Sequence, residues 1–162
     1  MTVTLDPSRD LELDRLLTAP PALVWRCWTE PDLICQWFCP KPWSVSQAVV
    51  DLRHGGRFFT LMNGPDGEVV PNEGRFLEVV PQRKLVFTDM FGADYAPVAV
   101  PASGAGLNFA AILTFLPEGK GTRYRAVARH RSPEDAEMHK SMGFHDGWGI
   151  AADQLDALAA TL

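Results

Sequence analysis

The sequence predicts a single α+β domain, spanning residues 1–162, in which one long C-terminal helix covers a strongly curved antiparallel sheet. Three observations lead to this prediction. Two short helical segments follow an N-terminal strand, six β-rich runs then fill residues 43–130, and residues 132–162 repeat their apolar positions at helical spacing. Because the β-rich runs are closely spaced, we expect them to pair as an antiparallel meander with the helix packed on one face.

Residues 9–17, RDLELDRLL, predict the first strand. Leu11, Leu13 and Leu16 are separated by charged residues, so the apolar positions fall on one face. The alternation slips by one residue near the end of the run. The charged positions predict that the opposite face is exposed to solvent, as in an antiparallel sheet with one wet side.

Two short helices are predicted between residues 18 and 38. Thr18 and Thr29 are expected to cap them, because a threonine oxygen can accept a hydrogen bond from the unpaired N–H groups of a first turn. A proline follows each threonine closely, at a position where a missing N–H costs nothing. Apolar residues then recur on one side of each helix: Leu23, Val24, Cys27 and Trp28 in the first, and Leu33, Ile34, Trp37 and Phe38 in the second.

Six β-rich runs are predicted as strands in the middle of the chain. Most are separated by clusters of Gly, Pro and Asn, which favour turns. The runs are WSVSQAVVDL, GRFFTLM, EGRFLEVV, KLVFTDMF, LNFAAILTFL and TRYRAVARH. Residues 92–106 interrupt them with a Gly-, Ala- and Pro-rich segment that has no periodicity, and we interpret it as a functional loop or a mobile flap.

The last predicted strand indicates a hollow beneath the sheet. Tyr124, Ala126, Ala128 and His130 share the face expected to point inward, whereas arginines dominate the other face. Two small inward residues either let a helix approach closely or leave empty space. The fourth run adds Asp89 among aromatic residues, which suggests an acid facing a partly apolar chamber. Asp89 could equally be solvated near a strand end, and His130 could be a hydrogen-bonded core residue.

The C-terminal segment is predicted as one long helix that begins at Ser132, a good N-cap. Glycines at 143, 147 and 149 each cost about 1 kcal/mol against alanine inside a helix, but the apolar stripe continues through them. A kink near residues 143–147 is the competing interpretation. The stripe consists of Phe144, Trp148, Ala151, Leu155, Leu158 and Leu162.

Composition and charge narrow the classes of function. The chain has 162 residues and a formal net charge of −5, which argues against nucleic acid and anionic membranes as partners. No stretch approaches the roughly 20 apolar residues of a membrane span, and no signal peptide is recognisable, so a cytoplasmic location is expected. The three cysteines, at 27, 35 and 39, are expected to be reduced packing residues.

Together these features predict a ligand cavity between the sheet and the helices. Ligand pockets are typically apolar with a few placed polar groups. The sequence offers aromatic walls, isolated polar groups, small inward residues and a helix that contains glycines. The residues predicted to line the cavity are Trp28, Trp37, Phe59, Phe76, Phe87, Asp89, Phe91, Phe109, Phe115, Tyr124, His130, Met142, His145 and Trp148.

Acid–base catalysis is the chemical alternative to simple binding. His145 and Asp89 are the candidate catalytic residues, and His130, Glu73 and Tyr124 are further groups that could face the same space. No recognisable catalytic set can be assigned. We expect no metal, because no His or Cys spacing matches a zinc motif, and no nucleotide cofactor, because the turn HGGRF joins two strands rather than a strand and a helix.

Three segments of the sequence resemble a known family. They are APPALVWRCWTEPDLICQWF, DLRHGGRFF with EGRFLEVVPQRKLVFTDMF, and GTRYRAVARHRSPEDAEMHKSMGFHDGWGIAADQL. They look like bacterial proteins related to the C-terminal domain of the Hsp90 ATPase activator, within the START-like superfamily of polyketide cyclases and plant pollen-allergen lipid carriers. The resemblance covers residues 9–160. It implies a helix-grip fold, in which a curved antiparallel sheet surrounds a long C-terminal helix over an internal cavity.

From the predicted cavity we expect the protein to bind a small hydrophobic or amphipathic molecule. The resemblance is unspecific about activity and supplies no shared catalytic residues. A cyclase- or aromatase-like enzyme acting on a polyketide-like or aromatic substrate is the first alternative, and a chaperone-interaction module is the second. The extra N-terminal domain of the eukaryotic co-chaperone is not found in this sequence, so Hsp90 activation is not carried over. The implied partner is a small hydrophobic ligand, no cofactor is implied, and homodimer formation is left open.

Overall fold

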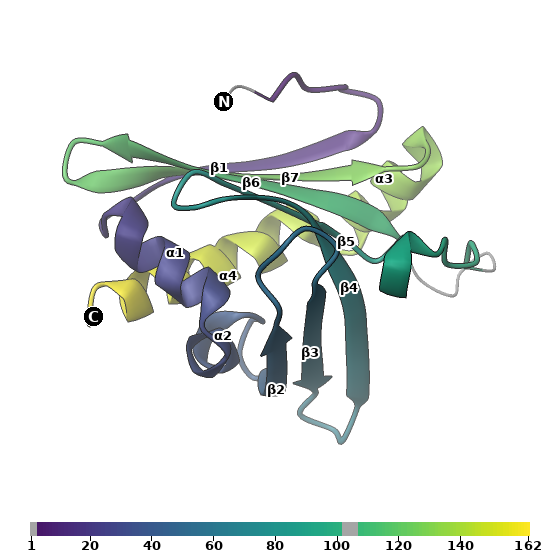
Figure 1. Cartoon of the computed structure of the whole chain (residues 1–162), viewed down its shortest axis with the longest axis horizontal. Helices are drawn as coiled ribbons and strands as arrows, with labels where there is room; N and C mark the ends of the chain where they lie inside the picture. Colours follow the sequence, from purple (N-terminus) through teal and green to yellow (C-terminus); the bar gives the residue numbers. More distant parts are fainter. Residues whose placement is uncertain (1–2, 102–106) are drawn as a thin grey trace.

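The computed structural model describes residues 3–101 and 107–162, which form a seven-stranded antiparallel sheet with helices on one side (Figure 1). The spatial order of the strands is β1-β7-β6-β5-β4-β3-β2, so the first strand pairs with the last and the others follow as a meander. The strands are β1 (Asp10–Leu17), β2 (Ser44–Val50), β3 (Arg57–Asn63), β4 (Val69–Val80), β5 (Lys84–Thr88), β6 (Phe109–Glu118) and β7 (Gly121–His130). The helices are α1 (Pro21–Thr29), α2 (Pro31–Trp37), η1 (Ala93–Tyr95), α3 (Pro133–Ser141) and α4 (Phe144–Ala159).

The sheet is strongly curved, and α4 lies against its concave side. Figure 1 shows β1, β6 and β7 running in one direction while β2, β3 and β4 turn away from them. The pairing register shifts between Val45 and Gln47 on β2 and between Phe76 and Glu78 on β4. Such bulges bend a strand and increase its twist. The pair α1–α2 packs against α4 and β2, so the helices and the sheet enclose a common interior.

The predicted alternation of faces is correct for the last strand and wrong by one residue at the end of the first. The inward residues of β7 are all buried, as expected. In β1, however, Leu17 is buried, whereas Leu16 is 56% exposed because it pairs with Arg123 on the outer face. The outer face of this strand pair carries ion pairs, such as Arg125 with Glu12, so the arginine-rich face is the solvent side.

Thr18 and Thr29 do not cap the first two helices. The N-cap positions are Pro20 for α1 and Glu30 for α2, and neither makes a capping side-chain hydrogen bond. Thr18 instead donates its N–H and its hydroxyl to Asp156 of α4, both at 2.9 Å. The Thr29 hydroxyl donates to a carbonyl one turn earlier in α1. The first of these threonines therefore joins distant parts of the chain.

The C-terminal segment forms two helices rather than the one long helix that was predicted. The α3 helix begins after Ser132, whose hydroxyl accepts a hydrogen bond from the Asp135 N–H at 3.1 Å. Gly143 then adopts φ 95° and ψ 34°, a left-handed conformation that separates α3 from α4. Gly147 and Gly149 lie within α4. The kink interpretation is therefore correct, and the break lies at the first of the three glycines.

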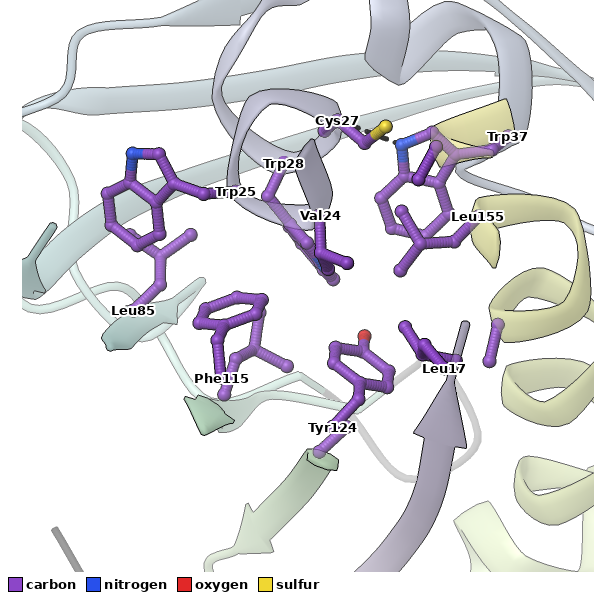
Figure 2. Close-up of a cluster of buried hydrophobic side chains, with 14 of the residues drawn as sticks. Leu17, Val24, Trp25, Cys27, Trp28, Trp37, Leu85, Phe115, Tyr124 and Leu155 are labelled. Carbon is purple, nitrogen blue, oxygen red and sulfur yellow. Dashed lines mark hydrogen bonds between the residues drawn. The ribbon is translucent and has the colours of Figure 1, made fainter. Parts of the chain in front are cut away.

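Aromatic side chains dominate the buried core between the sheet and the helices (Figure 2). Trp25 packs edge-to-face on Phe115 with ring centres 5.6 Å apart. Trp37 donates its indole N–H to the main-chain carbonyl of Cys27 at 2.9 Å. The three cysteines are free, and burial raises the pKa of the Cys27 thiol to about 11. Trp25, Trp37 and Cys27 are therefore packing residues of the core.

Candidate ligand-binding cavity

A cavity of about 360 Å³ lies between the concave face of the sheet and the helices α1, α2 and α4. Cavities that hold small molecules typically measure roughly 300–1,000 Å³. Strands β3 to β7 supply the sheet side of the wall, and the cavity is partly open to solvent. The wall residue Asn72 is exposed and marks the open end, whereas Trp28 and Tyr124 are buried and mark the inner end.

Aromatic rings form most of the cavity wall. The ring of Trp28 lies 4.8 Å from that of Trp37 and 5.8 Å from that of Phe87, measured between ring centres. Phe109 and Trp148, whose ring centres are 6.0 Å apart, belong to another part of the wall. Ring pairs at these distances are held by edge and tilted contacts. The wall therefore offers a broad apolar surface to an aromatic or aliphatic molecule.

Small residues of α4 leave the space that the cavity occupies. Gly147, Ala151 and Ala152 lie in its wall, together with the larger Trp148. A methyl group added at Gly147 would meet no other atom within 4 Å. The glycine is therefore not required by close packing against the sheet. Its missing side chain leaves one side of the cavity empty.

Several polar groups of the wall are hydrogen-bonded to the protein itself. The Asn72 amide donates to the Thr60 hydroxyl at 3.3 Å, and the Thr88 hydroxyl donates to the Phe109 carbonyl at 2.9 Å. The Asp89 carboxylate accepts a hydrogen bond from the Phe109 N–H at 3.1 Å. Burial raises the pKa of Asp89 above its ordinary value, although hydrogen bonds from the Asn108 side chain and the Phe109 N–H oppose the shift.

The inner end of the cavity contains two polar groups in apolar surroundings. Tyr124 is 3% exposed, and burial raises the pKa of its phenol strongly. Figure 2 shows its hydroxyl pointing into the buried cluster, toward Trp28 and Leu155. The indole N–H of Trp28 lies close enough to lower the pKa of Tyr124. It nevertheless meets no acceptor in hydrogen-bonding geometry among the described residues.

Half of the fourteen residues predicted to line the cavity lie in its wall. They are Trp28, Trp37, Phe87, Asp89, Phe109, Tyr124 and Trp148. The other half lie elsewhere and are Phe59, Phe76, Phe91, Phe115, His130, Met142 and His145. That the cavity holds a ligand stays a prediction. The part of the predicted flap at residues 102–106 lies outside the described residues.

The four misplaced phenylalanines have simple structural reasons. Phe76 and Phe115 are fully buried, but they pack in the core rather than facing empty space. Phe59 lies on the outer face of β3, where the Arg57 guanidinium sits 4.6 Å from the centre of its ring. Phe91 lies beyond the end of β5, in an isolated bridge. Aromatic character alone did not distinguish these environments.

His145, Met142 and His130 also lie outside the cavity wall. His145 is exposed and Met142 is 69% exposed, and neither side chain lines the cavity. His130 is buried, but its Nδ1 bonds the main-chain carbonyl of residue 9 at 2.9 Å and its Nε2 lies 2.8 Å from Nδ1 of His139. It is the hydrogen-bonded core histidine that the sequence left as an alternative.

The proposed acid–base group is therefore not assembled around the cavity. Asp89 and Tyr124 share the wall, but neither His130 nor His145 joins them. The Glu73 residue borders the cavity, yet its carboxylate forms an ion pair on the outer face of the sheet. A carboxyl group and a phenol remain, without an imidazole between them.

Several wall residues were not predicted from the sequence, among them the three that share one face of β3. Phe58, Thr60 and Met62 point into the cavity, so the predicted inward residue, Phe59, was one position out of phase. The polar ends of the strand, Arg57 and Asn63, share the face of Phe59. Because alternate residues of a strand point to the same face, these two polar residues indicated that Phe59 faces solvent. The other missed wall residues are Phe38, Cys39, Pro40, Asn72, Gly74, Thr88, Leu107, Gly147, Ala151 and Ala152.

Of the two acidic wall residues, only Asp89 can give the cavity a negative charge, because the Glu73 carboxylate forms its ion pair on the outer face of the sheet. Among the described residues of the wall there is no Lys, Arg or His. Within residues 3–101 and 107–162, no three His, Cys, Asp or Glu side chains lie close enough together to hold a metal ion. In the same described part of the chain, every helix is too short or too polar to cross a bilayer.

Comparison with known proteins gives one family and several structures. The model of the family described as Activator of Hsp90 ATPase homolog 1-like protein matches residues 18–160. A crystal structure from Nitrosomonas europaea is similar over 97% of both chains, with 44% identity and a TM-score of 0.90. A Rhodobacter sphaeroides protein has the same fold over 99% of both chains, at 21% identity and a TM-score of 0.82. An AHSA1-like protein from Aeromonas hydrophila shares the fold at 19% identity, 94% and 92% coverage and a TM-score of 0.69. No protein of curated function matches significantly.

Proposed function

Because the chain belongs to the family of Activator of Hsp90 ATPase homolog 1-like proteins, we propose that it binds a small hydrophobic or amphipathic molecule in its cavity. The observation that carries the proposal is an aromatic-walled space of about 360 Å³ inside a chain of 162 residues. Protein interiors are ordinarily packed as densely as organic crystals. Side chains that border empty space lose dispersion contacts, and a bound apolar molecule would restore them.

The arrangement of small and large residues supports the proposal. Gly147, Ala151 and Ala152 line the cavity from α4, and Trp28 and Trp37 line it from α1 and α2. Larger aliphatic residues on α4 would fill the space and stabilise the helix. A lining that combines aromatic rings with small apolar residues suits a flat or elongated apolar molecule.

A thermal-shift screen of lipophilic compounds tests the proposal. A ligand present at about 100 times its Kd stabilises the folded protein by roughly 2.7 kcal/mol, so hits raise the Tm of the wild type. Gly147→Leu places a side chain in the cavity and is expected to abolish those shifts. Glu137→Leu adds the same side chain on an exposed position of α3 and is expected to keep them. Shifts that persist in Gly147→Leu, or no shift with any compound, would contradict the proposal.

The family description favours a second candidate, a chaperone-interaction module. This function predicts direct binding to bacterial Hsp90, with the cavity playing no part. A pull-down at micromolar concentrations distinguishes it, because Gly147→Leu would leave chaperone binding intact. Failure to capture the chaperone would remove this candidate and leave small-molecule binding in place.

A further inference from the structure

We infer that the molecule bound in the cavity is not anionic and carries a hydrogen-bond acceptor, such as a carbonyl oxygen, that meets the indole N–H of Trp28. The inference rests on the proposed function, since it names the class of ligand for the same site. It follows from three properties of the inner end: an unpaired donor, a neighbouring hydroxyl and a wall without cations.

The first property is the donor that the protein leaves unpaired. Trp28 is 4% exposed, and its Nε1 is buried without a partner among the described residues. An unmade hydrogen bond on a buried donor is costly, because folding has removed its water without supplying a replacement. Trp37 provides the comparison: it also lies in the wall, but its indole N–H donates to the Cys27 carbonyl at 2.9 Å. An indole N–H can only donate, so Trp28 calls for an acceptor from outside the protein.

The second property is the position of Tyr124 beside this donor. Its hydroxyl is buried at the same end of the cavity and points into the cluster that contains Trp28 (Figure 2). A hydroxyl can rotate to donate or to accept. One ligand oxygen could therefore accept from both Trp28 and Tyr124. The remainder of the wall at this end is aromatic or aliphatic, so a single acceptor on an apolar body matches the site.

The third property excludes an anionic ligand. In the part of the chain that the structure describes, the wall residues include Glu73 and Asp89 but no Lys, Arg or His. Arg131 is near enough to Asp89 to favour its charged form slightly, but it does not line the cavity. A carboxylate carried to the inner end would lose its hydration without gaining a cation, which is strongly unfavourable. A ketone, aldehyde, ester or ether oxygen carries no such penalty.

Three matched probes separate the inference from the proposed function: benzophenone, diphenylmethane and diphenylacetate. The first has a carbonyl, the second replaces it by a methylene group, and the third carries a carboxylate. In calorimetric titration of the wild type, we expect benzophenone to bind about tenfold more tightly than diphenylmethane, because one buried hydrogen bond changes the Kd by about that factor. Diphenylacetate is expected to bind weakest. Binding of diphenylacetate as tight as benzophenone would overturn the inference.

Trp28→Phe keeps an aromatic ring and removes the N–H. It is expected to lower benzophenone affinity about tenfold and to leave diphenylmethane affinity within about twofold. Trp148→Phe removes another indole from the wall and is the control, expected to weaken both probes alike. A loss in Trp28→Phe that is equal for the two probes would overturn the inference while leaving small-molecule binding intact. If none of the three probes binds and no other lipophile binds either, the proposed function itself would be contradicted.

The infrared spectrum of bound benzophenone gives a readout that does not depend on a variant folding. A hydrogen bond to the carbonyl lowers its stretching frequency relative to the same ketone in an alkane solvent. We expect such a shift in the wild-type complex and, where Trp28→Phe folds, a smaller shift in that variant. An alkane-like frequency in the wild-type complex would overturn the inference.

Discussion

Gln154 joins α4 to the end of α2 through the main chain. Its amide donates to the carbonyls of Trp37 and Cys39 at 2.9 and 2.8 Å, and its oxygen accepts from the Lys41 N–H at 3.1 Å. Three main-chain groups of the α2–β2 connection thus depend on one side chain. Because Trp37 and Cys39 also line the cavity, this residue fixes part of the wall.

Gln154→Leu is expected to lower the free energy of unfolding by about 1–3 kcal/mol, because buried carbonyls lose their partner. The measurement is urea denaturation at constant pH. Gln36→Leu is the control, because Gln36 is exposed and bonds a single carbonyl of its own helix. Its effect is expected to stay within about 0.5 kcal/mol. Equal effects at the two positions would show that Gln154 does not hold the connection.

The pair formed by His130 and His139 predicts a dependence of stability on pH. When both rings are neutral, Nδ1–H of His130 donates to the residue 9 carbonyl, and Nε2 accepts from Nδ1–H of His139. Burial, with His130 nearby, lowers the pKa of His139 from 6.5 to about 4. Between pH 4 and pH 6.5, His139 of the unfolded chain binds a proton that the folded chain does not bind. The stability that the neutral His139 contributes is therefore complete above pH 6.5 and is lost as the pH falls toward 4.

His139→Asn tests this prediction, since its amide keeps a donor near the position of Nδ1. The free energy of unfolding of the wild type is expected to fall more steeply between pH 6.5 and 4 than that of the variant. Denaturation series at matched ionic strength give both curves. Parallel curves would mean that His139 does not carry the pH dependence.

Single residues show why the sequence predicted only part of the cavity wall. Strand alternation identifies pairs of faces but not which face is inward, and Phe58 and Phe59 are equally aromatic. Burial of His130 was compatible with the sequence, but its partner His139 lies on a separate helix. That contact depends on tertiary structure, which local periodicity does not contain.

At the scale of elements, the glycines of the C-terminal segment have three separate environments. Gly143 adopts a positive φ between two helices, Gly147 borders the cavity, and Gly149 packs near Arg15. The apolar stripe of the sequence is compatible with one helix or two, because it begins only at Phe144, after the break. The sequence therefore predicted helical structure correctly but not its continuity.

Alanine at Gly143 and at Gly147 is expected to change stability in opposite directions. At Gly143 the side chain must adopt a left-handed conformation, which costs about 1–2 kcal/mol. At Gly147 the same change adds helix propensity of up to about 1 kcal/mol and meets no atom within 4 Å. Thermal and urea unfolding of the two variants check the prediction. Stabilisation by Gly143→Ala would contradict the break at this residue.

Gly147→Ala and Gly149→Ala separate helix propensity from cavity volume. Both glycines lie inside α4, but only Gly147 is in the wall. A methyl at Gly149 would come within 2.6 Å of the Arg15 guanidinium, the flexible end of a half-exposed side chain that can move aside. Titration with benzophenone is expected to show weaker binding to Gly147→Ala than to the wild type and unchanged binding to Gly149→Ala. Equal affinities in all three proteins would mean that the ligand does not contact α4 at this position.

At the scale of the whole molecule, the predicted α+β helix-grip fold is confirmed by the sheet order, the C-terminal helix and the similar solved structures. Order and approximate boundaries followed from periodicity and turn residues. The curvature was predicted as well, but the positions of the bulges in β2 and β4 that produce it were not, because no residue pattern marks them. The cavity depends on that curvature together with the small residues of α4. Its existence could thus be predicted, but its wall could be predicted only in part.

The indole N–H signals of the protein give the most direct measurement of the central claim. The chain has five tryptophans, so a nitrogen–proton correlation spectrum contains five such signals, and Trp28→Phe identifies one of them. On titration with benzophenone we expect the Trp28 signal to move downfield and to saturate, because its N–H gains an acceptor at the inner end of the cavity. A Trp28 signal that stays in place while the ketone binds would contradict the account.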